Sequence, residues 1–163
     1  MLVIVIIGVV YTLAISKLQS VKEGEVSPTL LNLKEYLLSQ LDEDAKSVKI
    51  LCLDECQECD IYLDDTKVKT IESFFDATIE RYRYDLLQGA IKLKESSYFN
   101  EDDVQESVCF SFEVDKNGVS EQIMVLYKER VYDYTPYFDK TQEYDSLSEA
   151  VDAKERLREE VMQ

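Results

Sequence analysis

Histidine and tryptophan are absent from this chain of 163 residues. Histidine is the most common general base and the most common metal ligand in proteins, so its absence excludes the sites that are built on it. Glycine and proline are rare, with 4 and 2 residues, and no long Gly/Ser or Pro tract indicates a disordered tail. No nucleophile–base pair, phosphate-binding loop or dinucleotide-binding fingerprint is recognisable. We therefore expect a folded protein that is not an enzyme and needs no cofactor.

Positive charge is also scarce. The chain has 18 lysines and arginines against 34 aspartates and glutamates, which gives a formal net charge of -16 at pH 7. Nucleic-acid binding depends on Lys and Arg contacts to phosphates, so this balance argues against direct binding through a broad basic face. The hydrophobic content of 45% is that of a folded protein, and the length suits one compact domain beyond the opening segment.

Charge is missing altogether from Met1 to Ser16, and Lys17 is the first charged residue. The run is longer than the roughly 4–8 residues of a strand, and it falls slightly short of the ~20 that span a bilayer. A helix buried in a globular core keeps a polar face, whereas Leu2–Val10 is apolar all round. A cleaved signal peptide has a basic segment before the run and a small-residue cleavage site, and neither is present. We favour a membrane helix, with the core helix and the cleaved signal as alternatives.

The residues expected to contact lipid or neighbouring helices share this apolar run. They are Leu2, Val3, Ile4, Val5, Ile6, Ile7, Val9, Val10, Leu13 and Ile15.

The run Met1-Leu-Val-Ile-Val-Ile-Ile-Gly8-Val-Val-Tyr-Thr-Leu-Ala14-Ile resembles the amino-terminal helix of type IV pilins and type II secretion pseudopilins. In that family the run follows a short basic leader, a processed Gly–Phe junction and a Thr-Leu-hydrophobic-Glu stretch. By this comparison the chain is expected to start a few residues late. The leader, the methylated Phe and the Glu that pairs with the next subunit are then missing. The resemblance covers about the first 20 residues.

The resemblance implies a minor, H-like pseudopilin or pilin-like structural subunit of a type II secretion, type IV pilus or DNA-uptake (competence) filament. The implied partners are other pilin and pseudopilin subunits, an inner-membrane platform protein, an assembly ATPase and a prepilin peptidase. The implied location is the inner membrane, with a single pass and the C-terminal domain in the periplasm, although Lys17 and Lys22 are weak cytoplasmic signals. The alternative is a membrane-anchored periplasmic binding or accessory domain that does not polymerise.

We expect two parts, an apolar membrane or filament helix over 1–23 and an acidic periplasmic domain over 24–163. In the domain, Ser27-Pro28 is typical of a helix start, and leucines follow at helical spacing from Leu30 to Leu41. Ser146-Leu-Ser-Glu149 is a capping-box pattern that predicts a C-terminal helix. The expected fold class is α+β, in which a long N-terminal helix packs on an antiparallel β-sheet and a helix ends the chain.

Strands are predicted where apolar and polar residues alternate, at Val48–Leu53, Asp60–Leu63 and Ile79–Leu86. The segment 67–75 fits either a helix or a strand. The clearest pattern is a hairpin over 108–127, because Asn117-Gly118 supplies the residues of a tight turn between two alternating runs.

The cysteines are Cys52, Cys56, Cys59 and Cys109. Their Cys-x3-Cys-x2-Cys spacing matches the cluster motif of radical S-adenosylmethionine enzymes, but the chain is too short for the barrel which that chemistry needs. A four-thiolate zinc site and free buried thiols are further alternatives. We favour two disulfides, because the count is even and the expected compartment is oxidising. A tight hairpin would place Cys52 opposite Cys59 and let Cys56 reach Cys109, although three pairings remain open.

Acidic clusters and tyrosines are the remaining candidates. The clusters Asp42–Asp44, Asp64–Asp65 and Glu101–Asp103 are expected to be solvated surface; the segment 100–103 is the best calcium candidate but lacks the spaced ligands of an EF-hand. One group of tyrosines fits either a contact surface for a partner subunit or packing over the sheet. These tyrosines are Tyr132, Tyr134, Tyr137 and Tyr144.

Overall fold

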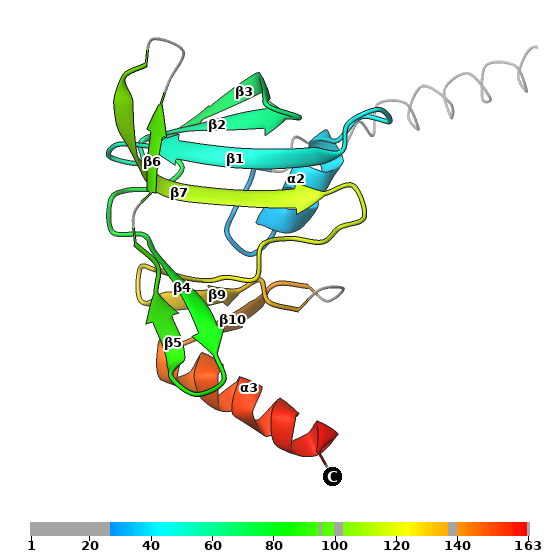
Figure 1. Cartoon of the computed structure of the whole chain (residues 1–163), viewed down its shortest axis with the longest axis vertical. Coiled ribbons are helices and arrows are strands. Elements are labelled where there is room, and N and C mark those ends of the chain that lie inside the picture. The colour runs from blue at the N-terminus through cyan, green and yellow to red at the C-terminus, as the bar shows by residue number, and fades with distance from the viewer. Residues whose placement is uncertain (1–26, 95, 100–102, 137–139, 163) are drawn as a thin grey trace, which may run out of the picture.

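The computed structural model describes residues 27–94, 96–99, 103–136 and 140–162 (Figure 1). The membrane helix predicted for residues 1–23 lies outside these residues. The described chain forms two antiparallel sheets of five strands each, together with two short helices.

The first sheet has the strand order β3-β2-β1-β7-β6. Its strands are β1 (Ser47–Leu53), β2 (Glu58–Leu63), β3 (Thr66–Glu72), β6 (Ser96–Phe99) and β7 (Gln105–Asp115). Helix α2 (Leu33–Gln40) lies against the apolar face of this sheet and contacts β1 and β7. The alternation along β7 is regular, with Phe110, Phe112 and Val114 fully buried on that face.

The second sheet has the order β10-β9-β8-β4-β5 and lies below the first in Figure 1. Its strands are β4 (Glu80–Asp85), β5 (Gly89–Lys92), β8 (Met124–Tyr127), β9 (Arg130–Asp133) and β10 (Gln142–Tyr144). Helix α3 (Leu147–Val161) contacts β5, β9 and β10 on the side away from the first sheet.

One apolar cluster joins the two sheets and α2. Phe75 is central to it, because its ring meets Phe110 of the first sheet at 4.9 Å and Tyr127 of the second at 5.6 Å between centroids. A smaller cluster joins the second sheet to α3 through Met124, Val131 and Ala150, all fully buried. Burial of apolar surface in these clusters is the main source of stability.

The predicted α+β fold, with a long N-terminal helix on one antiparallel sheet, is wrong for the described part of the chain. That part is mainly β structure, and its helices have 8 and 15 residues. None of the described helices has the length and apolar character required to cross a membrane. The alternating pattern identified individual strands, but strand pairing depends on contacts between distant segments and divides the strands between two sheets.

The predicted hairpin over 108–127 is also wrong. A turn does form at Asn117 and Gly118, and Gly118 has the left-handed φ of 79° that the turn requires. The two strands separate after a single bridge between Val114 and Ser120, and β7 and β8 then belong to different sheets. The carbonyl of Ser111 on β7 accepts a hydrogen bond from the Arg81 side chain, so a side chain occupies a position on β7 where the expected hairpin would place backbone pairing.

The first helix begins later than predicted. Ser27 and Pro28 do not start it, because Thr29 and Asn32 form a local turn in which each backbone N–H donates to the other's side-chain oxygen, at 2.6 and 3.3 Å. These bonds compete with helical pairing, and α2 starts at Leu33. The C-terminal helix begins as the capping box indicates, with the Glu149 N–H donating to Ser146 Oγ and the Asp145 N–H to Glu149 Oε2.

Candidate functional site

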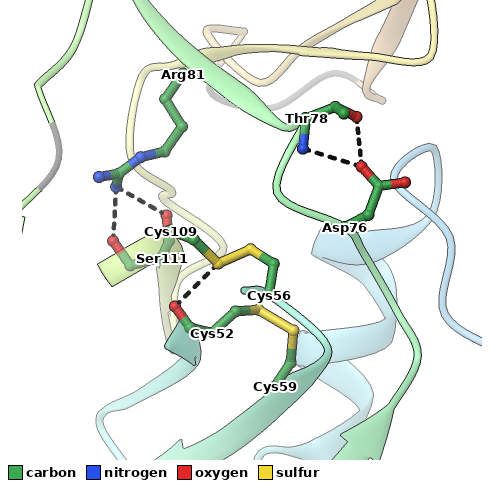
Figure 2. The surroundings of a disulfide bond; sticks show 8 residues. All are labelled: Cys52, Cys56, Cys59, Asp76, Thr78, Arg81, Cys109 and Ser111. Carbon is green, nitrogen blue, oxygen red and sulfur yellow. Dashed lines mark hydrogen bonds between the residues drawn. A yellow bond between two sulfur atoms is a disulfide. The ribbon is translucent and has the colours of Figure 1, made fainter. Parts of the chain in front are cut away.

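The four cysteines form two disulfides around the turn between β1 and β2 (Figure 2). Cys52 and Cys59 face one another in the β1–β2 register, with their Cα atoms 4.1 Å apart. Cys56 lies in the turn and is bonded to Cys109 of β7, the strand that flanks β1 on its other side, at a Cα separation of 5.8 Å. This pairing is one of the three that the sequence left open.

The two disulfides lie next to one another. Cys109 Sγ is 3.3 Å from the carbonyl oxygen of Cys52, and the sulfur of Cys52 is bonded to that of Cys59. All four sulfurs are bonded in pairs, so none is a thiolate that could hold zinc or an iron–sulfur cluster. In the described residues, no group of three or more Cys, Asp or Glu side chains is arranged to hold a metal ion. Paired cysteines of this kind are typical of an oxidising compartment.

The β1–β2 turn separates two clefts of different charge. The larger has a volume of about 520 Å³ and a mainly acidic wall, with Asp54 and Glu55 from the turn and Glu106 from β7. The smaller has a volume of about 150 Å³ and lies beside the first residues of β4 and the end of β5. Its charged lining is mixed and comprises Asp54, Glu80, Arg81, Lys92 and Lys94. Cys109 also lines this smaller cleft.

Arg81 connects the second sheet to the first beside the disulfides. Its Nη1 atom donates to the hydroxyl of Ser111 at 2.7 Å and to the carbonyl of the same residue at 3.4 Å (Figure 2). Burial lowers the pKa of the Arg81 guanidinium, and the carboxylate of Glu121 opposes that shift. Sequence reasoning missed this residue, because Arg81 alternates with tyrosines in a strand that reads as half exposed.

The loop before β4 is held by Asp76. Its carboxylate accepts from the backbone N–H of Thr78 at 3.0 Å, from the Thr78 hydroxyl, and from the Tyr127 hydroxyl at 3.2 Å. Hydrogen bonds from Thr78 are the main reason that the pKa of Asp76 lies below its ordinary value. The carboxylate therefore fixes the chain that leads into the smaller cleft.

The N-terminal end of the described chain is attached to the domain through Tyr134. This tyrosine is 2% exposed, and its hydroxyl donates to the carbonyl of Leu30, two residues after Pro28. Its ring packs on Phe112 with centroids 4.5 Å apart. Burial raises the pKa of Tyr134 well above its ordinary value. The segment before α2 is thereby joined to the main core.

The tyrosine group does not form a single exposed contact surface. Tyr134 is buried in the main cluster, whereas Tyr132 and Tyr144 are partly buried. Burial is the first cause of the raised pKa of Tyr132 and of Tyr144. Tyr137 lies outside the described residues.

Two of the acidic clusters hold turns rather than ligands. Asp42 Oδ1 accepts from the N–H of Ala45 at 2.8 Å, and Asp64 accepts from the backbone N–H groups of Lys46 and Ser47 at 3.0 Å. These backbone donors lower the pKa of Asp64. In the third cluster, Glu101 and Asp102 lie outside the described residues, and Asp103 is exposed. The calcium candidate at 100–103 therefore lies mostly outside the described chain.

A buried ion pair that the sequence analysis did not select joins α3 to the second sheet. Lys154 Nζ lies 2.6 Å from Asp133 Oδ2, and the two side chains are 12% and 2% exposed. The ammonium group also donates to the Thr135 hydroxyl and lies 5.7 Å from the centre of the Tyr84 ring. The sequence held one indication of this contact: helical spacing places Lys154 on the same face of the predicted helix as Ala150 and Leu157.

Comparison with known proteins adds no relative. No protein-family model matches the chain, and no curated protein or solved structure was found to match it.

Proposed function

We propose that this protein is a pilin-like structural subunit of the minor pseudopilin type, made for a short filament of a secretion, pilus or DNA-uptake machine. Its apolar amino-terminal segment resides in the inner membrane before assembly and among the corresponding segments of sibling subunits afterwards. The acidic domain stays on the periplasmic side and contacts neighbouring subunits or cargo.

The observation that carries this proposal is the uncharged run from Met1 to Ser16, followed by a strongly acidic domain with two disulfides. A segment that is apolar on every side is stable in lipid or bundled with similar segments, so assembly exchanges one apolar environment for another. Disulfides persist in oxidising compartments, which agrees with a domain beyond the membrane.

The attachment at Tyr134 supports a structural role. A filament subunit has to transmit the position of its membrane or core segment to the surface domain. The bond from Tyr134 to the Leu30 carbonyl, together with the buried Leu33 and Leu37, fixes the chain at the start of the domain. A domain that is anchored only to keep it near the membrane would work equally well on a flexible linker.

Fractionation tests the membrane role of the apolar run. In cells that produce the full chain from its own gene, we expect the protein in the membrane pellet and the Ile6→Lys variant in the soluble fraction. A lysine in the centre of a lipid-embedded segment is unfavourable by about 2.5–3.5 kcal/mol. The matched control is Leu157→Lys at a side chain that is 60% exposed, and it should leave the protein in the membrane. Recovery of the unmodified chain in the cytosol with all thiols reduced would contradict the proposal.

Photo-crosslinking separates a filament subunit from an anchored domain that never polymerises. A photoreactive amino acid at Val9 should form covalent adducts with other pilin-like subunits in a sheared filament fraction. The same reactive group at Glu43, an exposed site on the domain, should give no adduct with the apolar segments of those subunits. A protein that stays in the membrane but never enters the sheared fraction is the non-polymerising alternative.

A further inference from the structure

The two disulfides differ in their access to solvent. Cys52, Cys56 and Cys59 are fully buried, whereas Cys109 is partly exposed and lines the smaller cleft. Thiol–disulfide exchange requires a thiolate to reach one of the two sulfur atoms in line with the bond that breaks. In the Cys56–Cys109 bond one of the two cysteines reaches the smaller cleft, whereas in the Cys52–Cys59 bond both cysteines are buried in the main apolar cluster.

The cleft around Cys109 suits thiolate chemistry. Arg81 is held there by Ser111, which lies two residues from Cys109 on the same face of β7, and Lys92 and Lys94 line the same cleft. Nearby cations stabilise a thiolate and so favour both its approach and its departure. Two carboxylates, Asp54 and Glu80, moderate this effect, and Glu80 is bonded to Lys92. The net charge of -16 affects the approach of a thiolate to either disulfide, so it does not determine which of the two is reduced faster.

The turn that carries Cys56 is held in an unfavourable backbone conformation. Asp54 and Cys56 have φ values of 49° and 62°, in the left-handed region that non-glycine residues rarely adopt. Residues in this conformation are strained, and they keep it only where the surrounding structure holds them. The bond from Cys56 to Cys109 links this turn covalently to β7, and the Asp54 N–H also donates to the Ser107 carbonyl at 2.8 Å. Cleavage of the disulfide therefore removes the covalent link between the turn and β7 and leaves the hydrogen bond.

We propose that Cys56–Cys109 is a thiol-exchange site that accepts a dithiol reductant through the smaller cleft, while Cys52–Cys59 is a structural bond. This inference is independent of the filament role, since it rests on the described domain alone.

The reaction balances in two steps. One thiolate of the dithiol attacks Cys109 Sγ, a new sulfur–sulfur bond forms, and the Cys56–Cys109 bond breaks with Cys56 leaving as a thiolate that then takes a proton. The second thiol of the reagent, after losing its proton, attacks its own sulfur in the mixed disulfide. Cys109 leaves as a thiolate beside Arg81 and is protonated. The dithiol is oxidised to a disulfide, and the protein gains two thiols.

The test is a timed reduction of the full chain, purified in a mild non-ionic detergent, with dithiothreitol. Samples are quenched with one thiol-alkylating reagent, then denatured, fully reduced and treated with an isotopically distinct one, and each cysteine is followed by peptide mass spectrometry. We expect Cys56 and Cys109 to be alkylated together, about tenfold or more faster than Cys52 and Cys59, because access governs the rate of attack. Equal rates for all four cysteines, or earlier reaction of Cys52 and Cys59, would overturn the proposal.

A cleft-filling variant tests the route. Ala77→Leu enlarges an exposed side chain in the lining of the smaller cleft and should slow reduction of Cys56–Cys109 without changing the rate for Cys52–Cys59. Ala153→Leu in α3 makes the same change away from the cleft and should leave both rates unchanged. An Ala77→Leu variant that is reduced as fast as the parent chain would show that the reagent does not enter through this cleft and would refute the proposed site.

Discussion

The hydroxyl of Tyr134 satisfies a backbone carbonyl that α2 leaves outside its own hydrogen-bonding pattern. Replacing it in Tyr134→Phe keeps the ring against Phe112 and removes only the donor to Leu30. We expect the free energy of unfolding to fall by about 1–3 kcal/mol, because a buried carbonyl loses its partner. Urea denaturation followed by circular dichroism measures the change.

Tyr84→Phe is the matched control for that substitution. The Tyr84 ring lies beside Lys154, and a phenylalanine retains this contact. The control should change the free energy of unfolding by less than about 0.5 kcal/mol. Equal losses in the two variants would show that the bond to Leu30 contributes nothing particular to the attachment of the N-terminal segment.

Asp64 makes the stability of the domain depend on pH. Backbone N–H groups of Lys46 and Ser47 lower its pKa below the ordinary value of 3.8. A carboxyl group with a lowered pKa stabilises the folded state above its ordinary value, and this contribution is lost as the pH falls through the folded-state pKa. The Asp64→Asn variant should therefore have a lower Tm than the parent chain at pH 7, and the gap should shrink as the pH falls below 3.8.

The neighbouring Asp65 provides the control, because its carboxylate is exposed and lies 3.9 Å from Lys49 Nζ, whereas that of Asp64 accepts from backbone N–H groups. Asp65→Asn should follow the parent chain across the same pH series. A gap between Asp64→Asn and the parent chain that stays constant down to pH 2 would mean that the ionised carboxylate is not what holds the turn.

At the scale of secondary-structure elements, α3 is attached to its sheet by the buried pair between Lys154 and Asp133. Lys154→Met leaves a carboxylate that is 2% exposed without its cation, and we expect a loss of about 3–5 kcal/mol in the free energy of unfolding. The double variant Lys154→Met/Asp133→Asn should recover part of that loss, since no charge is then buried alone. Chemical denaturation of all three proteins measures both changes.

Lys67→Met tests whether burial of the ion pair is the reason for the expected loss of stability in Lys154→Met. Lys67 and Asp60 are 2.7 Å apart, but the lysine side chain is 53% exposed. An exposed pair contributes about 0–1 kcal/mol, so this variant should lie close to the parent chain. Similar losses for Lys67→Met and Lys154→Met would contradict the assignment of Lys154 as the attachment of α3.

Individual helices and strands were easier to predict from the sequence than the segments with which they pair or pack. The capping box at Ser146 and Glu149 and the alternation along β7 depend on neighbouring residues, so both could be predicted from local sequence. Strand pairing around Asn117-Gly118 could not, because β7 pairs with β1 and β6 whereas β8 pairs with β4 and β9, and these partners are distant in sequence. The ion pair of Lys154 was hidden for the same reason, since its partner lies 21 residues away.

At the scale of the whole molecule, the two disulfides should stabilise the domain unequally. They close loops with sequence separations of 7 and 53 residues. Chain-entropy arguments assign about 2 kcal/mol to the shorter loop and about 4 kcal/mol to the longer one. We expect the Cys56→Ser/Cys109→Ser variant to have a lower denaturation midpoint than the Cys52→Ser/Cys59→Ser variant under oxidising conditions. The opposite order would mean that the buried cross-strand bond contributes through packing more than through chain entropy.

The disulfide pairing illustrates what sequence reasoning reached at this scale. The hairpin interpretation placed Cys52 opposite Cys59 and let Cys56 reach Cys109, and the structure has both bonds. The sequence could not choose among the three pairings, because that choice depends on the placement of β7 beside β1. The division of the chain into two sheets was out of reach for the same reason. Alternation shows which side chains of a strand face the core, and it does not show which other strand lies alongside.

The long disulfide loop also has a mechanical consequence. Tension applied to the two ends of the domain cannot extend the chain between Cys56 and Cys109, which are 53 residues apart in sequence. At about 3.4 Å per extended residue, roughly 180 Å of contour length is withheld from the stretched chain. Strands β2 to β6, from both sheets, lie within this closed loop, whereas α2 and β1 on one side and β8, β9, β10 and α3 on the other lie outside it. Reduction of Cys56–Cys109 alone would make this contour length available to extension, apart from the short loop that Cys52–Cys59 still closes.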